Sequence, residues 1–293
     1  MARAAILAAL LLLFAAPRTP PAQVNLSEFV IPTAGADPVD IALGPDGDLW
    51  FSEQHSDRIG RISPRGAITE FPLPMARSFA RGIVAGPDGA LWFTELPGRI
   101  GRITTAGEIT ELTLPGGVTE PVEIALGPDR NLWFTDYYNR IGRMTTSGFV
   151  TFFAIPTSAS APRGIAAGPD GAMWFTESAA GQIGRITTDG LVTEFPLAQG
   201  SGPFGIAAGP DGDLWFTEQT SNKIGRIVTT SGKISEFSVP TPNAVPYGIA
   251  LGPDGNIWFT EAEVNKIGRV NINSLTRKAS PLKPAPHVVN PRR

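Results

Sequence analysis

Residues 161–197 read APRGIAAGPDGAMWFTESAAGQIGRITTDGLVTEFPL, and this stretch contains four short strand patterns separated by turns. In the turn Pro169-Asp170-Gly171, proline fixes φ, aspartate bonds its own backbone and glycine takes φ > 0. The segments between the turns are too short for helices and are rich in β-formers. The pattern predicts four antiparallel strands, at Gly164–Ala167, Met173–Glu177, Ile183–Thr187 and Leu191–Phe195.

The same phrase occurs six times along the chain. Its tryptophan marks the spacing of 41 to 43 residues, with copies at Trp50, Trp92, Trp133, Trp174, Trp215 and Trp258. Four strands per period of about 40 residues are typical of one blade of a β-propeller. The sequence therefore predicts an all-β fold, a six-bladed β-propeller of four-stranded blades. Seven full blades would need about 290 residues at this period, more than the mature chain holds.

The fourth-strand phrase has one additional copy near the start of the chain, Leu26–Pro32 (LSEFVIP). The last repeat, by contrast, loses its pattern after Val270 and continues as a degenerate stretch, Ile272–Ser280. We expect Leu26–Pro32 to supply the outer strand of the sixth blade and close the ring. Closure removes an open sheet edge that would otherwise pair with another chain.

The two ends of the chain differ from the repeats. Ile6–Ala16 is continuously apolar after Arg3, which predicts a secretory signal peptide over residues 1–22; eleven apolar residues are too few to span a membrane, and a retained anchor is the alternative. A secreted or periplasmic protein follows from this prediction. The propeller domain is expected over residues 23–280, and the proline-rich tail 281–293 is expected to be disordered.

Composition excludes several classes of function. Hydrophobic residues make up 42% of the chain and charged residues 17%, which is typical of a packed domain. The net charge of −3 without a basic run argues against a nucleic-acid partner. The chain has no cysteine, so thiol and disulfide chemistry are excluded. We expect a monomer.

Two repeated charges have a structural interpretation. Each copy carries an acid shortly after its tryptophan and an arginine after Ile-Gly, and a single ligand cannot use six symmetric copies. We interpret them as a ring of ion pairs or hydrogen bonds that fixes neighbouring strands, and the tryptophans as blade-to-blade packing. The acids are Glu53, Glu95, Asp136, Glu177, Glu218 and Glu261; the arginines are Arg61, Arg102, Arg143, Arg185, Arg226 and Arg269.

The repeats disagree at the start of each inner strand, which we expect at one rim of the central channel. The side chains there are Asp40, Glu123, Arg81, Arg163, Phe204 and Tyr247, and the loop after the second strand adds His55, Tyr137 and Tyr138. Charges orient a ligand and aromatic faces contact its apolar part, so this mixture predicts a site for a small molecule or peptide. The alternative is that Arg81 and Arg163 neutralise Asp40 and Glu123 across a wet channel. Asp40, Glu120 and Glu123 are candidate ligands for Mg²⁺ or Ca²⁺, which bind carboxylate oxygens.

The phrases WFTE, IGRI and ITEFPLP, with Pro-x-Gly-Ile before GPDG, closely resemble the virginiamycin B lyase (streptogramin B lyase) family from about Leu26 to Val270. The resemblance implies a Mg²⁺-dependent lyase that opens a cyclic depsipeptide by elimination across its ester, and it implies a seven-bladed ring. It also implies histidine directly after proline in two blades, with glutamate before one of those prolines. Glu120 matches that glutamate, but the six positions after proline, or its equivalent Ala80, hold Val39, Arg81, Val122, Arg163, Phe204 and Tyr247.

Three functions stay open at this point, and whether the protein is an enzyme is one of the open points. The absent histidines favour a secreted ligand-binding module. The second is an active lyase with Glu120, Glu123 or His55 as the base. A carboxylate needs a raised pKa for that role, and Arg81 and Arg163 act in the opposite direction. The third is a metal-dependent lactonase.

Overall fold

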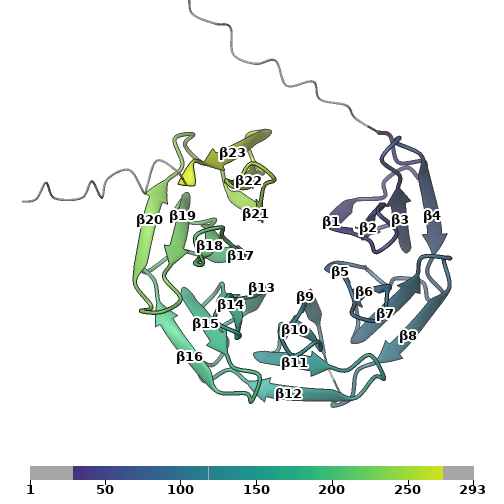
Figure 1. Cartoon of the computed structure of the whole chain (residues 1–293), viewed down its shortest axis with the longest axis horizontal. Helices are drawn as coiled ribbons and strands as arrows, with labels where there is room; N and C mark the ends of the chain where they lie inside the picture. Colours follow the sequence, from purple (N-terminus) through teal and green to yellow (C-terminus); the bar gives the residue numbers. More distant parts are fainter. Residues whose placement is uncertain (1–28, 118, 273–293) are drawn as a thin grey trace, which may run out of the picture. The chain divides into compact units, whose positions relative to one another are not determined.

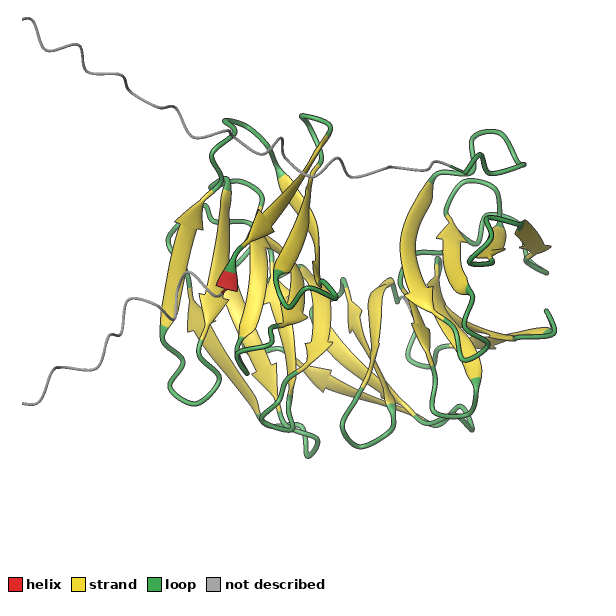
Figure 2. Cartoon of the chain, turned by 45° about the horizontal axis from the view of Figure 1, so that its top comes forward, coloured by secondary structure: helices red, strands yellow, loops and turns green. Residues whose placement is uncertain are grey.

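The computed structural model describes residues 29–117 and 119–272, and the chain divides into two units, residues 1–30 and 31–293. The described part of the second unit contains twenty-three β-strands in six antiparallel sheets. The sheets follow one another around a common centre as the blades of a propeller (Figure 1), and short loops and turns join their strands (Figure 2). No helix in the described ranges is long and apolar enough to cross a membrane.

Five blades have four strands in chain order, and the sixth has three. The strands are β1 (Pro38–Leu43), β2 (Leu49–Glu53), β3 (Arg58–Ile62) and β4 (Ile68–Pro72); β5 (Ile83–Ala85), β6 (Ala90–Glu95), β7 (Arg99–Thr104) and β8 (Ile109–Thr113); β9 (Pro121–Leu126), β10 (Leu132–Asp136), β11 (Arg140–Met144) and β12 (Val150–Ala154); β13 (Pro162–Ala167), β14 (Met173–Glu177), β15 (Gln182–Ile186) and β16 (Val192–Pro196); β17 (Pro203–Ala208), β18 (Leu214–Glu218), β19 (Lys223–Ile227) and β20 (Ile234–Ser238); and β21 (Pro246–Leu251), β22 (Ile257–Glu261) and β23 (Lys266–Val270). The first strand of each blade lies next to the centre and the fourth at the outside (Figure 1). The prediction of six blades is confirmed.

The predicted closing strand is described only in part. Its last four residues, Phe29–Pro32, are described and are not in a strand, and residues 26–28 are not described. The ring closure by Leu26–Pro32 therefore stays a prediction. The predicted signal peptide (residues 1–22) and tail (residues 281–293) also lie outside the described residues.

Each tryptophan packs one blade against the next, as predicted. Trp50 lies in a buried cluster with Leu91 and Phe93 of the second blade, and the other tryptophans up to Trp215 repeat this contact. These five indoles are fully buried, whereas Trp258 of the sixth blade is 36% exposed. No blade follows the sixth among the described residues, so the contact that buries the indole is missing there.

The repeated arginines pair with a different acid from the one predicted. In the fourth blade, Asp170 of the Pro-Asp-Gly turn accepts hydrogen bonds from the indole of Trp174 (3.0 Å) and from Arg185 (2.6 Å). Arg185 lies over the same indole at 5.8 Å, so turn, indole and arginine form one unit, which all six blades repeat. The acid after the tryptophan is instead buried at the end of the second strand; burial raises the pKa of Glu95 and of Glu177 to about 7.

A cysteine pair tests the predicted ring closure. In the fifth blade Ile224 pairs with Phe237, and LSEFVIP matches the ISEFSVP of that strand, so Phe29 is expected opposite Ile267. We expect a Phe29→Cys/Ile267→Cys variant to form a disulfide on mild oxidation, because paired strands bring such Cα atoms within about 5 Å. Mass spectrometry of a non-reduced digest detects the bridge. A monomer without a bridge would contradict closure; each single cysteine variant is the control.

Candidate functional site

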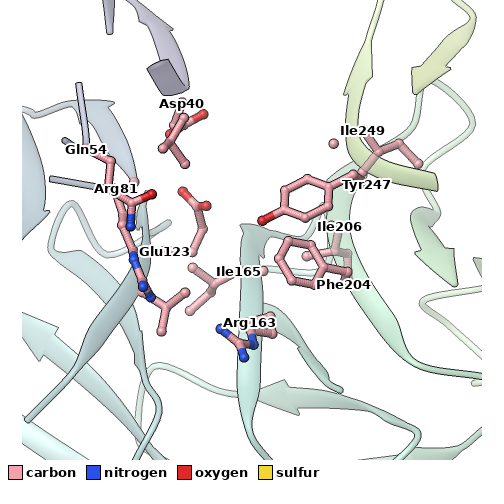
Figure 3. Close-up of a pocket in the computed structure, with 16 residues that line it drawn as sticks. Asp40, Gln54, Arg81, Glu123, Arg163, Ile165, Phe204, Ile206, Tyr247 and Ile249 are labelled. Carbon is pink, nitrogen blue, oxygen red and sulfur yellow. The ribbon is translucent and has the colours of Figure 1, made fainter. Parts of the chain in front are cut away.

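The first strands of the blades surround a cavity of about 470 Å³. All six side chains predicted at the rim line it: Asp40, Arg81, Glu123, Arg163, Phe204 and Tyr247 (Figure 3). Two kinds of lining residue were not predicted from the sequence. Gln54 directly follows the acid of the second strand, at a position that varies between repeats. The isoleucines of the Pro-x-Gly-Ile phrase form the apolar part of the cavity wall; they are Ile165, Ile206 and Ile249.

A β-bulge directs five of the six predicted rim side chains into the cavity, while Arg81 lies just before β5, whose pairing is regular. In the fourth blade Pro162 pairs with Glu177 and Ile165 with Phe175, so Arg163 and Gly164 together face one residue, Thr176. The same irregularity occurs in β1, β9, β17 and β21. A bulge bends the strand and re-aims its side chains. The two residues that vary between repeats are therefore those that the bulge releases from regular pairing.

The hydroxyl group facing each bulge holds it in place. The Thr176 hydroxyl accepts a hydrogen bond from Gly164 N (2.9 Å) and donates one to the carbonyl of Phe204 in the next blade (2.7 Å). Ser52, Thr94, Thr135 and Thr217 make the same two bonds in their blades. One side chain thus satisfies the bulge of its own blade and links it to the bulge of the following blade.

Asp40 and Glu123 form a pair of carboxyl groups on the cavity wall. The charge of Asp40 acts on Glu123, and Asp40 Oδ2 accepts a hydrogen bond from Ile83 N (2.8 Å). Burial raises the pKa of Asp40; burial together with the Asp40 charge raises that of Glu123 well above the ordinary value. Two carboxyl groups that face each other make ionisation of each less favourable than that of an isolated carboxyl group.

The two arginines of the cavity do not neutralise this pair. Neither Arg81 nor Arg163 makes a salt bridge within 4.0 Å to any described residue. Arg163 lies over the ring of Tyr137 at 5.0 Å and over that of Phe204 at 5.8 Å. Burial, and next the charge of Arg163, lower the pKa of Arg81. The structure therefore does not contain the alternative arrangement, in which the two arginines neutralise Asp40 and Glu123.

Other predicted site residues lie away from the cavity wall. His55 pairs with Asp37 (Nδ1–Oδ2 2.9 Å), and its side chain is 58% exposed. Glu120 lies 3.5 Å from the hydroxyl of Tyr138, and neither residue lines the cavity. Of the three residues considered for catalysis, only Glu123 faces the cavity.

The carboxylates do not assemble the predicted metal site. No group of three or more His, Asp or Glu side chains able to hold a metal occurs among the residues that the structure describes. Asp40 and Glu123 lie together, but Glu120 lies beside Tyr138. The two guanidinium groups around the same cavity as Asp40 and Glu123 also oppose the binding of a divalent cation there.

Replacing the hydroxyl that holds one bulge is expected to destabilise the protein. Thr176→Val keeps the shape but leaves Gly164 N and the Phe204 carbonyl without their partner. Each unsatisfied buried group costs about 1–3 kcal/mol, so we expect the two groups together to lower the free energy of unfolding by about 2 kcal/mol or more. Urea titration measures it. Thr193→Val, on an exposed position of β16, is the control, and equal stability of the two variants would contradict the role of the hydroxyl.

The carboxyl pair predicts a pH dependence with a defined sign. A pKa raised by folding means that the folded protein binds more protons than the unfolded chain above pH 4.5, so stability falls as pH rises. Glu123→Gln removes one titrating group, and its unfolding free energy is expected to fall less between pH 5 and pH 8 than that of the wild type. Glu95 and Glu177 titrate in both proteins and cancel. Exposed Glu108→Gln is the control; the same pH slope in Glu123→Gln as in wild type would contradict the pairing.

Comparisons with known proteins agree with this architecture. The model of the virginiamycin B lyase family matches residues 21–139 and 198–282. A streptogramin B lyase structure is 42% identical over 84% of this chain and 82% of its own, with a TM-score of 0.80. A catalytically inactive histidine-to-alanine variant of virginiamycin B lyase from Staphylococcus aureus, solved with quinupristin, is 43% identical over 85% of both chains, with a TM-score of 0.80.

A more distant similarity concerns the fold alone. A gluconolactonase from Xanthomonas campestris is 16% identical over 76% of this chain and 82% of its own, with a TM-score of 0.59. A search of curated proteins gave no match. Because the family model covers most of the chain and the lyase structures exceed 40% identity, the chain belongs to the virginiamycin B lyase family.

Proposed function

We propose that this chain is a secreted, ligand-binding member of its family that holds an amphipathic small molecule or peptide in the central cavity without opening it. The observation that carries the proposal is the cavity of about 470 Å³, whose wall combines guanidinium, carboxyl and aromatic side chains and contains no histidine. A concave site with a few converging polar groups and apolar faces suits a ligand of that kind.

A solved structure of a relative supports a binding role without the lyase reaction. In the Staphylococcus aureus relative, replacement of one histidine by alanine gives a catalytically inactive enzyme. This chain has two histidines: His55 is paired with Asp37 away from the cavity wall, and His287 lies outside the described residues. A general base must reach the proton that it removes, and neither position supplies a base to the cavity among the described residues.

One observation favours a second candidate, an active lyase. Glu123 faces the cavity, and burial and the neighbouring Asp40 raise its pKa well above that of an ordinary glutamate. A carboxylate with a raised pKa can act as a general base near neutral pH. In this alternative Glu123 removes the proton, the ester C–O bond breaks, and the ring opens to an alkene and a carboxylate. A lactonase has no comparable support, because the metal ligands that it needs are not assembled.

Quinupristin distinguishes these functions. We expect calorimetry to detect binding of one molecule per chain, and chromatography with fragment-ion spectra to recover the cyclic compound after prolonged incubation. Phe204→Ala is expected to weaken binding about tenfold, because the ring supplies apolar contact in the cavity. Phe149→Ala, an exposed ring outside the cavity wall, is the control.

The opposite outcomes are equally specific. A linear product of unchanged mass that disappears in Glu123→Gln would establish the lyase and overturn a purely binding role. If calorimetry detects no heat of binding with quinupristin and the compound leaves the midpoint of thermal unfolding unchanged, the proposed binding function is wrong for this class of ligand.

A further inference from the structure

Two arginines of the cavity differ from the structural arginines of the repeat. Each repeat arginine, such as Arg102 or Arg185, has an aspartate within 4.0 Å. Arg81 and Arg163 are partly buried, yet neither has a salt bridge or a side-chain hydrogen bond to a described residue. Taking a guanidinium group partly out of water without a counter-charge is unfavourable. An anion in the cavity would supply the counter-charge that these two guanidinium groups lack among the described residues.

Two positive charges of the cavity wall act on each other. After burial, the charge of Arg163 lowers the pKa of Arg81, and Glu120 acts in the opposite direction from outside the wall. No described acid lies within 4.0 Å of either guanidinium group as a salt-bridge partner. An anion beside Arg81 and Arg163 would offset the repulsion between their like charges.

Three hydrogen-bond donors point into the same space. Figure 3 shows the ends of Arg81, Arg163 and Tyr247 directed into the cavity from three different blades. Burial raises the pKa of the Tyr247 hydroxyl. The charges of Arg163 and Arg81 lower it, and those of Glu123 and Asp37 raise it, so the hydroxyl lies within the field of all four groups. Two guanidinium groups and a phenol can together donate to both oxygens of a carboxylate.

Aromatic rings lie directly beside these donors. The rings of Phe204 and Tyr247 have their centroids 4.1 Å apart at an angle of 40°, and Tyr247 is 42% exposed. Arg163 lies over Phe204 and Tyr137, which holds its guanidinium plane in position at low entropic cost. A planar apolar group attached to the anion would therefore meet a ring face within the same cavity.

We infer that the cavity recognises an aromatic carboxylate, with Arg81, Arg163 and Tyr247 binding the carboxylate and Phe204 contacting the ring. A free C-terminal aromatic residue of a peptide has this chemistry. The inference rests on the proposed binding function and adds the class of ligand to it.

Two probes that differ only in charge test the inference. N-acetyl-L-phenylalanine carries the carboxylate and N-acetyl-L-phenylalaninamide does not, and calorimetry at pH 7 gives the affinity of each. We expect the carboxylate to bind at least about tenfold more tightly, since charge-assisted hydrogen bonds are roughly twice as strong as neutral ones. Arg81→Met and Arg163→Met are each expected to remove about tenfold of the affinity for the carboxylate and to leave the amide unchanged.

Arg65→Met, at an exposed position outside the cavity, is the matched control, and thermal unfolding verifies that each variant is folded. Equal affinity for the two probes, or variants that bind the carboxylate as wild type does, would overturn the aromatic carboxylate. If quinupristin binds while neither phenylalanine probe does, the inference fails and the binding function stands. If none of the three compounds binds, both fail.

Discussion

The hydroxyl group at the third position of Trp-Phe-Thr is the interaction on which the rest of this structure depends. It accepts a hydrogen bond from the bulge of its own blade and donates one to the bulge of the next, as Thr176 does for Gly164 and Phe204. Tryptophan packing brings neighbouring blades together, but apolar contact is not directional. The hydroxyl supplies the missing direction, because its two bonds fix the relative position of consecutive inner strands at the cavity wall.

This interaction also separates the scaffold from the site. The bulge is held through backbone atoms, so the side chains of its two residues are free to vary while the linkage stays the same. Arg163 and Phe204 are neighbours around the cavity, and both use only their carbonyl groups for this linkage. That is why a ring of nearly identical blades can carry a wall of unlike side chains without loss of packing.

The period of the sequence predicted the blades, and the disagreement between repeats predicted the residues of the cavity. Contacts between side chains were harder to predict from the sequence. The partner of the repeated arginine is the turn aspartate, such as Asp170, because both flank the indole across a hairpin, whereas the predicted partner is buried at the strand end. The pairing of Asp40 with Glu123 joins blades that are not consecutive, so spacing along the chain gives no sign of it. Glu120 and His55 lie close in sequence to the cavity residues Val122 and Gln54, but their own side chains do not line the cavity.

The sixth blade carries the same hydroxyl, Thr260, which accepts a bond from Gly248 N and has no recorded acceptor in a further blade among the described residues. Each blade thus offers the same two connecting groups, which are a second-strand hydroxyl on one side and an inner-strand carbonyl on the other. Repeats joined in this way are interchangeable parts: exchanging the order of two blades would rearrange which side chains meet across the cavity and leave every connector intact. Recombination between repeats, which are similar enough in sequence to exchange, would then generate new recognition surfaces in single steps.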